Sequence, residues 1–334
     1  CARRGLALTW HRHRAFCRWM APPHSTMMRT GLRIALALSA LLVLATAALL
    51  AWAWAPDLTP ADAEKRWAQA PSTFIEVDGL RMHLRDEGPP GDPTPIVLIH
   101  GTSASLHTWD GWTDALRTHR RVIRFDLPGF GLTGPNAADD YSMAVYVHLV
   151  LALLDQLGVQ RFAIGGNSLG GEVAWATAYA APQRVDRLIL VDAAGYAFES
   201  TSVPLAFRVA ALPGLRVLMG HLLPPGMVET SVRSVYGDPS RVTPELVQRY
   251  SDLARRAGNR HALTVRMAQR NTGREQDIRD LKLPTLILWG ARDRLIPPVN
   301  GERFAKDIAG SQLVVFKGLG HVPQEEDPAA TVAV

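Results

Sequence analysis

A serine between glycines lies at the middle of the chain, in residues 166–170, which read Gly-Asn-Ser-Leu-Gly. The apolar run at 161–165 predicts a strand, and the residues after the serine predict a helix. A strand that reverses sharply into a helix holds the serine in a strained backbone conformation, and the glycines leave room for the crossing backbone. We therefore predict that Ser168 is a nucleophile presented at the carboxyl end of a sheet.

A serine hydroxyl needs a base, and the base needs a carboxylate that orients it. Of the eleven histidines, His321 is the one that follows the last predicted strand, at the sheet edge expected for Ser168. Asp293 follows a buried strand 28 residues before His321, and we predict it as the acid. Asp192, at the end of the preceding strand, is the alternative.

Attack on a carbonyl group also requires donors for the oxyanion that develops. We expect these to be the backbone N–H groups of Leu169, directly after the serine, and of Thr102, in the loop after the strand at 95–99. His100 in the same loop is expected to be structural. Both cysteines lie within the first 17 residues, so thiolate chemistry and cysteine-ligated zinc are excluded from the body. The mechanism requires no metal and no organic cofactor.

Short apolar runs alternate with segments of helical spacing, which predicts an α/β fold with a doubly wound, mostly parallel sheet. The predicted strands are 74–77, 80–85, 95–99, 122–125, 162–165, 187–191, 285–289 and 312–316. Residues 197–280 contain helical stretches broken by prolines and no evident strand, so we predict an inserted helical cap. Its candidates for lining a substrate pocket are Phe198, Leu205, Phe207, Leu212, Leu215, Leu218, Met219 and Met227.

Residues 34–55 contain no charged side chain. As a helix they would extend about 33 Å, close to the thickness of a hydrocarbon core. Arg29 and Arg33 precede the segment, and Trp52 and Trp54 stand at its other end, as is typical of a membrane interface. We interpret it as a single-pass transmembrane anchor with the catalytic body on the extracytoplasmic side. The alternative is a signal peptide whose cleavage releases a secreted body.

The net charge of +5 comes from the N-terminus. Residues 1–33 hold seven arginines and no acidic residue, a charge of +7, so the other 301 residues have a net charge of −2. No nucleic-acid partner is therefore expected. Residues 1–26 are interpreted as translated upstream sequence or a basic tail, and 329–334 as the opening of a truncated helix. The predicted organisation is a basic segment 1–33, an anchor 34–55, a linker 56–72, a core 73–196 and 281–334, and a cap 197–280.

Over residues 73–330 these motifs resemble the α/β-hydrolase superfamily. The resemblance is carried by His-Gly-Thr at 100–102, Asp-Leu-Pro-Gly-Phe-Gly at 126–131, the serine motif at 166–171, residues 288–293, and 320–321 with 326–328. It implies the α/β-hydrolase fold and a Ser168–Asp293–His321 triad, and it leaves the substrate open.

The serine nucleophile argues against haloalkane dehalogenases and epoxide hydrolases, which carry an aspartate. Carbon–carbon hydrolases of meta-cleavage products share the serine motif, but they typically place tryptophan directly after the catalytic histidine, where this chain has Val322. No motif singles out cofactor-free haloperoxidases or proline iminopeptidases. We expect a carboxylesterase that acts on small-molecule esters through an acyl-enzyme. The alternatives are a carbon–carbon hydrolase, a membrane-associated lipase, or a binding protein without activity.

Overall fold

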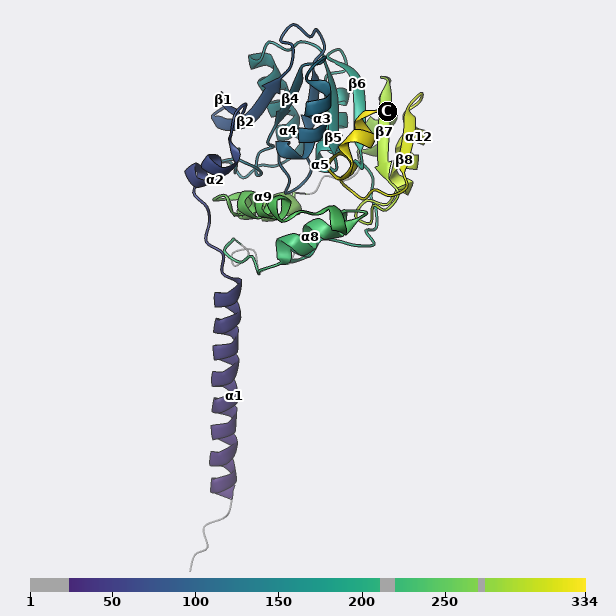
Figure 1. The fold of residues 1–334 in the computed structure, drawn as a ribbon. Helices are drawn as coiled ribbons and strands as arrows, with labels where there is room; N and C mark the ends of the chain where they lie inside the picture. The colour runs from purple at the N-terminus through teal and green to yellow at the C-terminus, as the bar shows by residue number, and fades with distance from the viewer. Residues whose placement is uncertain (1–23, 211–219, 270–273) are drawn as a thin grey trace, which may run out of the picture. The chain divides into compact units, whose positions relative to one another are not determined.

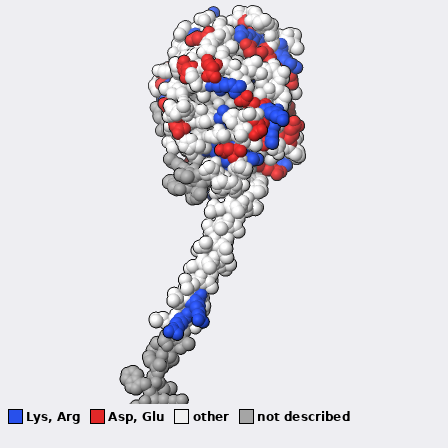
Figure 2. Space-filling view, turned by 90° about the vertical axis from the view of Figure 1, so that its left-hand side faces the viewer, with Lys and Arg blue, Asp and Glu red and all other residues white. Residues whose placement is uncertain are grey.

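The computed structural model describes residues 24–210, 220–269 and 274–334, and it divides into a unit up to Trp52 and a unit from Ala53 to Val334. The described residues of the first unit belong to helix α1 (His24–Ala53), whose last residue is the first of the second unit. The segment Met27–Ala53 is long and apolar enough to cross a membrane. Its apolar side chains are exposed; Leu38, Leu41 and Leu42 are 61 to 68 % accessible. Figure 2 shows an uncharged helix surface with basic side chains only near its outer end.

The second unit is built on one eight-stranded sheet, which confirms the predicted α/β fold (Figure 1). The strands are β1 (Thr73–Val77), β2 (Leu80–Glu87), β3 (Ile96–Ile99), β4 (Val122–Phe125), β5 (Phe162–Asn167), β6 (Val185–Val191), β7 (Thr285–Gly290) and β8 (Gln312–Phe316). Their order in the sheet is β1-β2-β4-β3-β5-β6-β7-β8. Strand β2 pairs antiparallel with both of its neighbours, and all pairs from β4 to β8 are parallel. All eight predicted strands are present.

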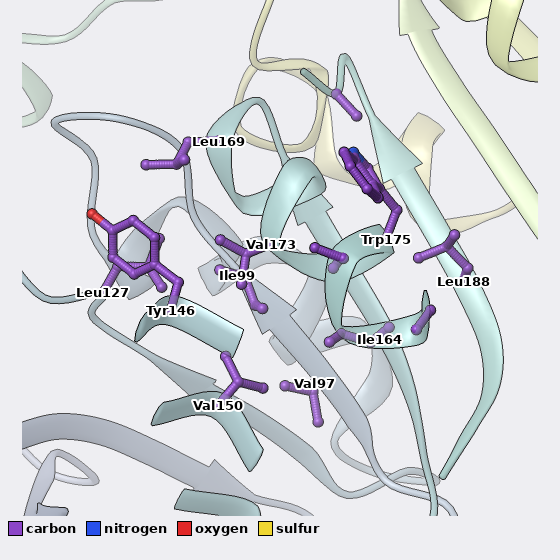
Figure 3. Packing of buried hydrophobic residues seen from close by; sticks show 14 of the residues in the cluster. Val97, Ile99, Leu127, Tyr146, Val150, Ile164, Leu169, Val173, Trp175 and Leu188 are labelled. Atoms are coloured by element: carbon purple, nitrogen blue, oxygen red, sulfur yellow. The ribbon is translucent and has the colours of Figure 1, made fainter. Parts of the chain in front are cut away.

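Helices cover both faces of the sheet, and alternate residues of each strand point to opposite faces. On one face, side chains such as Val97, Ile99 and Ile164 pack with α4 (Met143–Gln156) and α5 (Leu169–Ala180). Figure 3 shows part of this cluster, including Ile99, Tyr146 and Val173. On the other face, residues such as Leu98 pack with η1 (Leu106–Trp109), α3 (Asp110–Leu116) and α14 (Pro328–Val332). Because both faces are covered, the central strands read as continuous apolar runs.

Between β6 and β7 the described residues are helical. They form α6 (Leu205–Ala210), α8 (Met227–Val235), η2 (Pro239–Arg241), α9 (Pro244–Arg255), α10 (Asn259–Ala268) and α11 (Glu275–Arg279). Proline starts α9 after the Thr243 cap, whose side chain accepts the N–H of Leu246. Helix α12 (Val299–Asp307) follows β7, and α13 (Pro323–Glu326) follows β8.

The segment after α1 differs from the prediction. We expected the apolar helix to include residues 34–55, but α1 ends at Ala53, and Trp54 pairs antiparallel with Leu222 of the cap. The linker 56–72 was expected to hold a short helix, and it contains α2 (Pro60–Trp67), which begins after a Thr59 cap. The helix ends early because the backbone of residues 53 and 55 finds hydrogen-bond partners in the cap.

Candidate active site

Ser168 occupies the turn between β5 and α5, with φ 56° and ψ −118°. A positive φ is costly for a residue with a side chain and persists only where its surroundings enforce it. Here the surroundings are backbone: a Cβ added to Gly166 would lie 2.1 Å from the carbonyl oxygen of Gly170, and one added to Gly170 would lie 2.2 Å from that of Ile99. Both glycines of the motif are therefore required for the turn that presents Ser168.

His321 lies in the loop between β8 and α13, at the carboxyl ends of the parallel strands, where β5 also delivers Ser168. Both residues line the same cavity. The Nδ1 atom of His321 lies 2.7 Å from Oδ2 of Asp293, and both side chains are almost fully buried. This contact makes Nδ1 the donor and leaves Nε2 as the nitrogen able to accept a proton from a serine hydroxyl.

Asp293 is held by its own loop after β7. Its Oδ1 accepts the backbone N–H groups of Leu295 and Ile296 at 2.8 and 2.9 Å. Its other oxygen is thereby directed at His321. The structure thus pairs His321 with Asp293, the acid preferred from the sequence, rather than with Asp192.

Asp192 lies beside this pair at the end of β6 and is fully buried. Ligand atoms of Asp192, Asp293 and His321 all lie within 4.8 Å of one another, a spacing that could hold a metal ion. The hydrogen bonds of Asp293 to His321 and to two backbone N–H groups match an acid–base pair instead. Burial, and then the negative charge of Asp293, raise the pKa of Asp192 well above its ordinary value. The carboxyl of Asp192 therefore keeps its proton to a higher pH than an exposed aspartate does.

This protonation predicts a pH effect on stability. The folded state binds the Asp192 proton at pH values where the unfolded chain, with a pKa of about 3.9, has released it. Stability therefore falls as pH rises above about 4, by up to about 1.4 kcal/mol per pH unit for this one group. We expect Asp192→Asn to lack this fall, so its melting temperature should rise relative to that of the parent as the pH is raised above about 4. Turnover should stay within about threefold, because the amide resembles the protonated acid.

The control is Asp114→Asn, which changes a carboxyl that is 69 % exposed. It should leave the pH profile of the melting temperature unchanged. If Asp192→Asn gives the parental profile as well, Asp192 is ionised in the folded protein and the assignment of its proton is wrong.

The residues predicted to supply the oxyanion donors are Leu169 and Thr102. Leu169 is the first residue of α5, where backbone N–H groups have no intrahelical partner. Thr102 lines the cavity in the loop after β3. This loop packs directly against Ser168, because a Cβ on Gly101 would lie 3.1 Å from Cβ of Ser168. The oxyanion role of the Leu169 and Thr102 N–H groups stays a prediction.

His100 has no free nitrogen for catalysis. Its Nδ1 lies 2.7 Å from the carbonyl oxygen of Gly101, and its Nε2 accepts the N–H of Leu127 at 2.9 Å. Burial lowers its pKa. As expected from the sequence, it ties the loop after β3 to the loop after β4.

Asn167 and Glu326 position the histidine loop, and neither role was predicted from the sequence. The Nδ2 atom of Asn167 donates to the carbonyl oxygens of Val191 and His321, at 3.1 and 2.8 Å. Glu326 accepts the N–H groups of Gly320 and Gly237 on Oε2. These two side chains fix the histidine loop to β5 and to the cap. Glu326 is the first residue of the Glu-Asp-Pro motif at 326–328, which could have pointed to its role.

The cavity has a volume of about 130 Å³, whereas a single water needs about 10–15 Å³. It can therefore hold an organic group. The cap supplies most of its wall, with Phe207, Leu222, Leu223, Met227, Val228, Val232, Val235, Tyr250, Ala254, Arg260 and Leu263 among the lining residues.

Two of the cap residues predicted to line a pocket, Phe207 and Met227, do so. Phe198 instead packs against the main core, and Leu205 is exposed. The remaining four candidates, Leu212, Leu215, Leu218 and Met219, lie outside the described residues.

Comparison with known proteins agrees with this geometry. The family model described as the alpha/beta hydrolase fold matches residues 94–328. The chain belongs to the α/β-hydrolase family. Within that family, it is 33 % identical over 264 residues to a 2-hydroxy-6-oxo-2,4-heptadienoate hydrolase of Pseudomonas putida, an alignment that covers 76 % of this chain and 90 % of the relative.

Two solved α/β-hydrolase structures extend the comparison. A meta-cleavage product hydrolase from Pseudomonas fluorescens is 28 % identical, with a TM-score of 0.67, covering 78 % of this chain and 94 % of the other. A membrane phospholipase A described as a bacterial virulence factor is 26 % identical, with a TM-score of 0.66, covering 92 % of this chain and 96 % of the other. Since 92 % of 334 residues exceeds the 282 residues from Ala53 to Val334, this second likeness reaches into the N-terminal helix.

Proposed function

We propose that this α/β-hydrolase cleaves carboxylic esters through an acyl-enzyme formed on Ser168. Oγ of Ser168 bonds to the carbonyl carbon while His321 takes its proton, and the N–H groups of Leu169 and Thr102 receive the oxyanion. The C–O bond to the alcohol then breaks, and the alcohol leaves with the proton from His321. Water, deprotonated by the same histidine, releases the acid and restores the serine. Asp293 orients the imidazole and stabilises its charged form.

The observation that carries the proposal is the convergence of three features on one cavity. A serine held at a positive φ, an imidazole bonded to a buried carboxylate, and the first N–H of a helix occur together at one sheet edge. Strained nucleophiles and paired buried acids are costly, so their coincidence points to acyl-transfer chemistry rather than to a structural role.

The cavity lining favours a neutral, apolar substrate. The described lining contains one permanently charged side chain, Arg260, whose Nη2 already lies 2.6 Å from Oδ1 of Asp57. An anionic substrate would need an unneutralised positive partner to offset the loss of its hydration. An ester with an apolar acyl group carries no such cost.

A second candidate is carbon–carbon hydrolysis of a dienoate, as in the names of the Pseudomonas relatives. One observation favours it here: Nε and Nη1 of Arg260 are buried and have no hydrogen-bond partner among the described residues. A substrate carboxylate could accept from them if the side chain moved. Against this candidate, Val322 stands after His321 and lines the cavity, where the carbon–carbon hydrolases typically have tryptophan.

We also propose that α1 anchors the enzyme in a membrane, with the body extracytoplasmic because Arg29 and Arg33 precede the apolar stretch. The exposed apolar surface of α1 supports an anchor, as does the likeness to the membrane phospholipase A that extends into this helix. Cleavage after the helix, which would secrete the body, is the alternative. Carbonate extraction of membranes followed by an immunoblot separates a retained anchor from a released body.

The reaction is tested with p-nitrophenyl esters of increasing chain length beside 2-hydroxy-6-oxo-2,4-heptadienoate. We expect kcat/KM for the butyrate ester to exceed that for the dienoate at least 100-fold, because the cavity offers no unneutralised cation. A preference for the dienoate would overturn the ester assignment. In that case Arg260→Gln should raise KM for the dienoate.

A further inference from the structure

Residues 53–58, which follow the apolar helix, are hydrogen-bonded to the cap along their whole length. The N–H of Ala55 donates to the carbonyl oxygen of His221 at 2.9 Å, and the N–H of Leu223 donates to that of Ala53 at 2.8 Å. Further along, Leu58 exchanges backbone hydrogen bonds with Arg255 and Ala257, at 2.7 and 2.9 Å. We call residues 53–58 the latch segment.

A buried side chain adds to this attachment. Nη2 of Arg260, on α10, donates to the carbonyl oxygen of Ala55 at 2.7 Å and to Asp57. The Arg260 side chain is only 6 % exposed, so Asp57 cannot be removed without leaving a buried charge unpaired. The latch segment is thus fixed to the cap rather than acting as a flexible tether.

The cap residues that hold the latch segment also form the wall of the Ser168 cavity. Leu222 and Leu223, which pair with residues 53–55, line the cavity, and so does Arg260. Ala254, directly before the backbone partner of Leu58, lines it as well. Leu223, a residue of the cavity wall, is therefore hydrogen-bonded directly to Ala53, the residue that ends the apolar helix.

If α1 spans a membrane, Ala53 marks the level at which the chain leaves the hydrocarbon, and Leu223 lies within hydrogen-bonding reach of it. We propose that the cavity takes its substrate from the membrane that holds α1, with Leu222 and Leu223 forming the entry wall. The substrate class is an ester whose acyl chain resides in the bilayer. This inference rests on the proposed ester hydrolysis and on the anchor. An acyl chain that passes directly from the lipid to an apolar cavity wall is not exposed to water on the way. It therefore avoids the free-energy cost of hydrating each methylene group.

The test uses the full chain reconstituted in vesicles of phosphatidylcholine that also contain 4-methylumbelliferyl palmitate. A flexible Gly/Ser spacer of 12 residues is inserted between Trp52 and Ala53, which leaves the latch segment intact. Such a spacer has a root-mean-square length of about 20 Å and so separates the cavity wall from the membrane. The control places the same spacer between Pro90 and Gly91, in an exposed turn before β3. Water-soluble 4-methylumbelliferyl butyrate reports on Ser168 in every variant.

We expect the spacer after Trp52 to lower palmitate hydrolysis at least tenfold while butyrate hydrolysis stays within twofold, and the control insertion to change neither. Palmitate hydrolysis within twofold of the parent would overturn the inference. Parent protein that hydrolyses butyrate but not vesicle-bound palmitate would also overturn it and would leave the proposed ester hydrolysis standing. Failure on both esters would instead remove the proposed function.

A substitution in the wall gives an independent readout. Leu223→Asn keeps the backbone hydrogen bond to Ala53 but makes the wall polar, so the ratio of palmitate to butyrate turnover should fall about tenfold. Leu246→Asn is the matched control, because Leu246 is a half-buried leucine of the cap that packs beside cavity-lining residues but does not itself line the cavity. An equal change in the ratio for both variants would argue against an entry wall at Leu223.

Discussion

Ser168→Ala is expected to lower kcat for a short ester by at least about 10⁴-fold, because Ser168 is the serine that the turn between β5 and α5 presents to the cavity lined by His321. The fold should survive. Alanine keeps the backbone N–H that donates to Val191 and the carbonyl that accepts from Glu172 and Ala194. The free energy of unfolding should therefore change by less than about 1 kcal/mol. Initial rates with p-nitrophenyl butyrate measure the change in kcat, and a urea titration measures the change in the free energy of unfolding.

A fluorophosphonate probe supplies the control, since it labels only a serine that is activated by a base. The parent should be labelled, and Ser168→Ala should not. Ser234→Ala, on α8 and outside the cavity lining, should keep parental labelling and rate. His321→Ala should lose about as much rate as Ser168→Ala, and the double variant little more, because the two residues act as one unit. Parental turnover in Ser168→Ala would contradict the assignment of the nucleophile.

The sheet and the strained turn at Ser168 could be predicted because their sequence signals are local. Strand β3 is buried at all four positions, so it reads as a continuous apolar run. The glycines at 166 and 170 are required by backbone contacts within the turn itself or with the adjacent strand. Steric constraints of this kind leave few residue types possible, and the pattern is visible without a structure.

Other parts of the site could not be predicted because their contacts are not local and carry no pattern. Asn167 acts on carbonyl oxygens that are 24 and 154 residues away, and any residue could have occupied the variable position of the motif. The latch segment uses mainly backbone hydrogen bonds, which leave no trace in side-chain types. The sequence favoured Asp293 but left Asp192 as an alternative, since each follows a parallel strand at the same sheet edge. The choice between the two acids depends on local hydrogen bonds, because two backbone N–H groups direct Asp293 at His321.

Asp293→Asn is expected to lower kcat by about 10²- to 10⁴-fold, less than Ser168→Ala. The cause is the tautomer of His321. The N–H groups of Leu295 and Ile296 would hold the amide oxygen of the new side chain, so its NH₂ group would face Nδ1. Nδ1 would then have to accept, which places the proton on Nε2 and prevents it from taking the proton of Ser168. The pH dependence of kcat/KM for p-nitrophenyl butyrate, measured from pH 6 to pH 10, gives the size of the loss.

The residual activity of Asp293→Asn should rise with pH, because the substitution removes the charge that helps to keep Asp192 protonated. Once ionised, Asp192 lies close enough to His321 to attract the imidazolium that forms in the reaction. The double variant Asp192→Asn/Asp293→Asn tests this rescue. It should be about tenfold slower than Asp293→Asn at pH 9, while Asp192→Asn alone stays near the parental rate. Equal rates for the single and double variants at every pH would mean that Asp192 cannot replace the lost carboxylate, and that its buried proton affects stability alone.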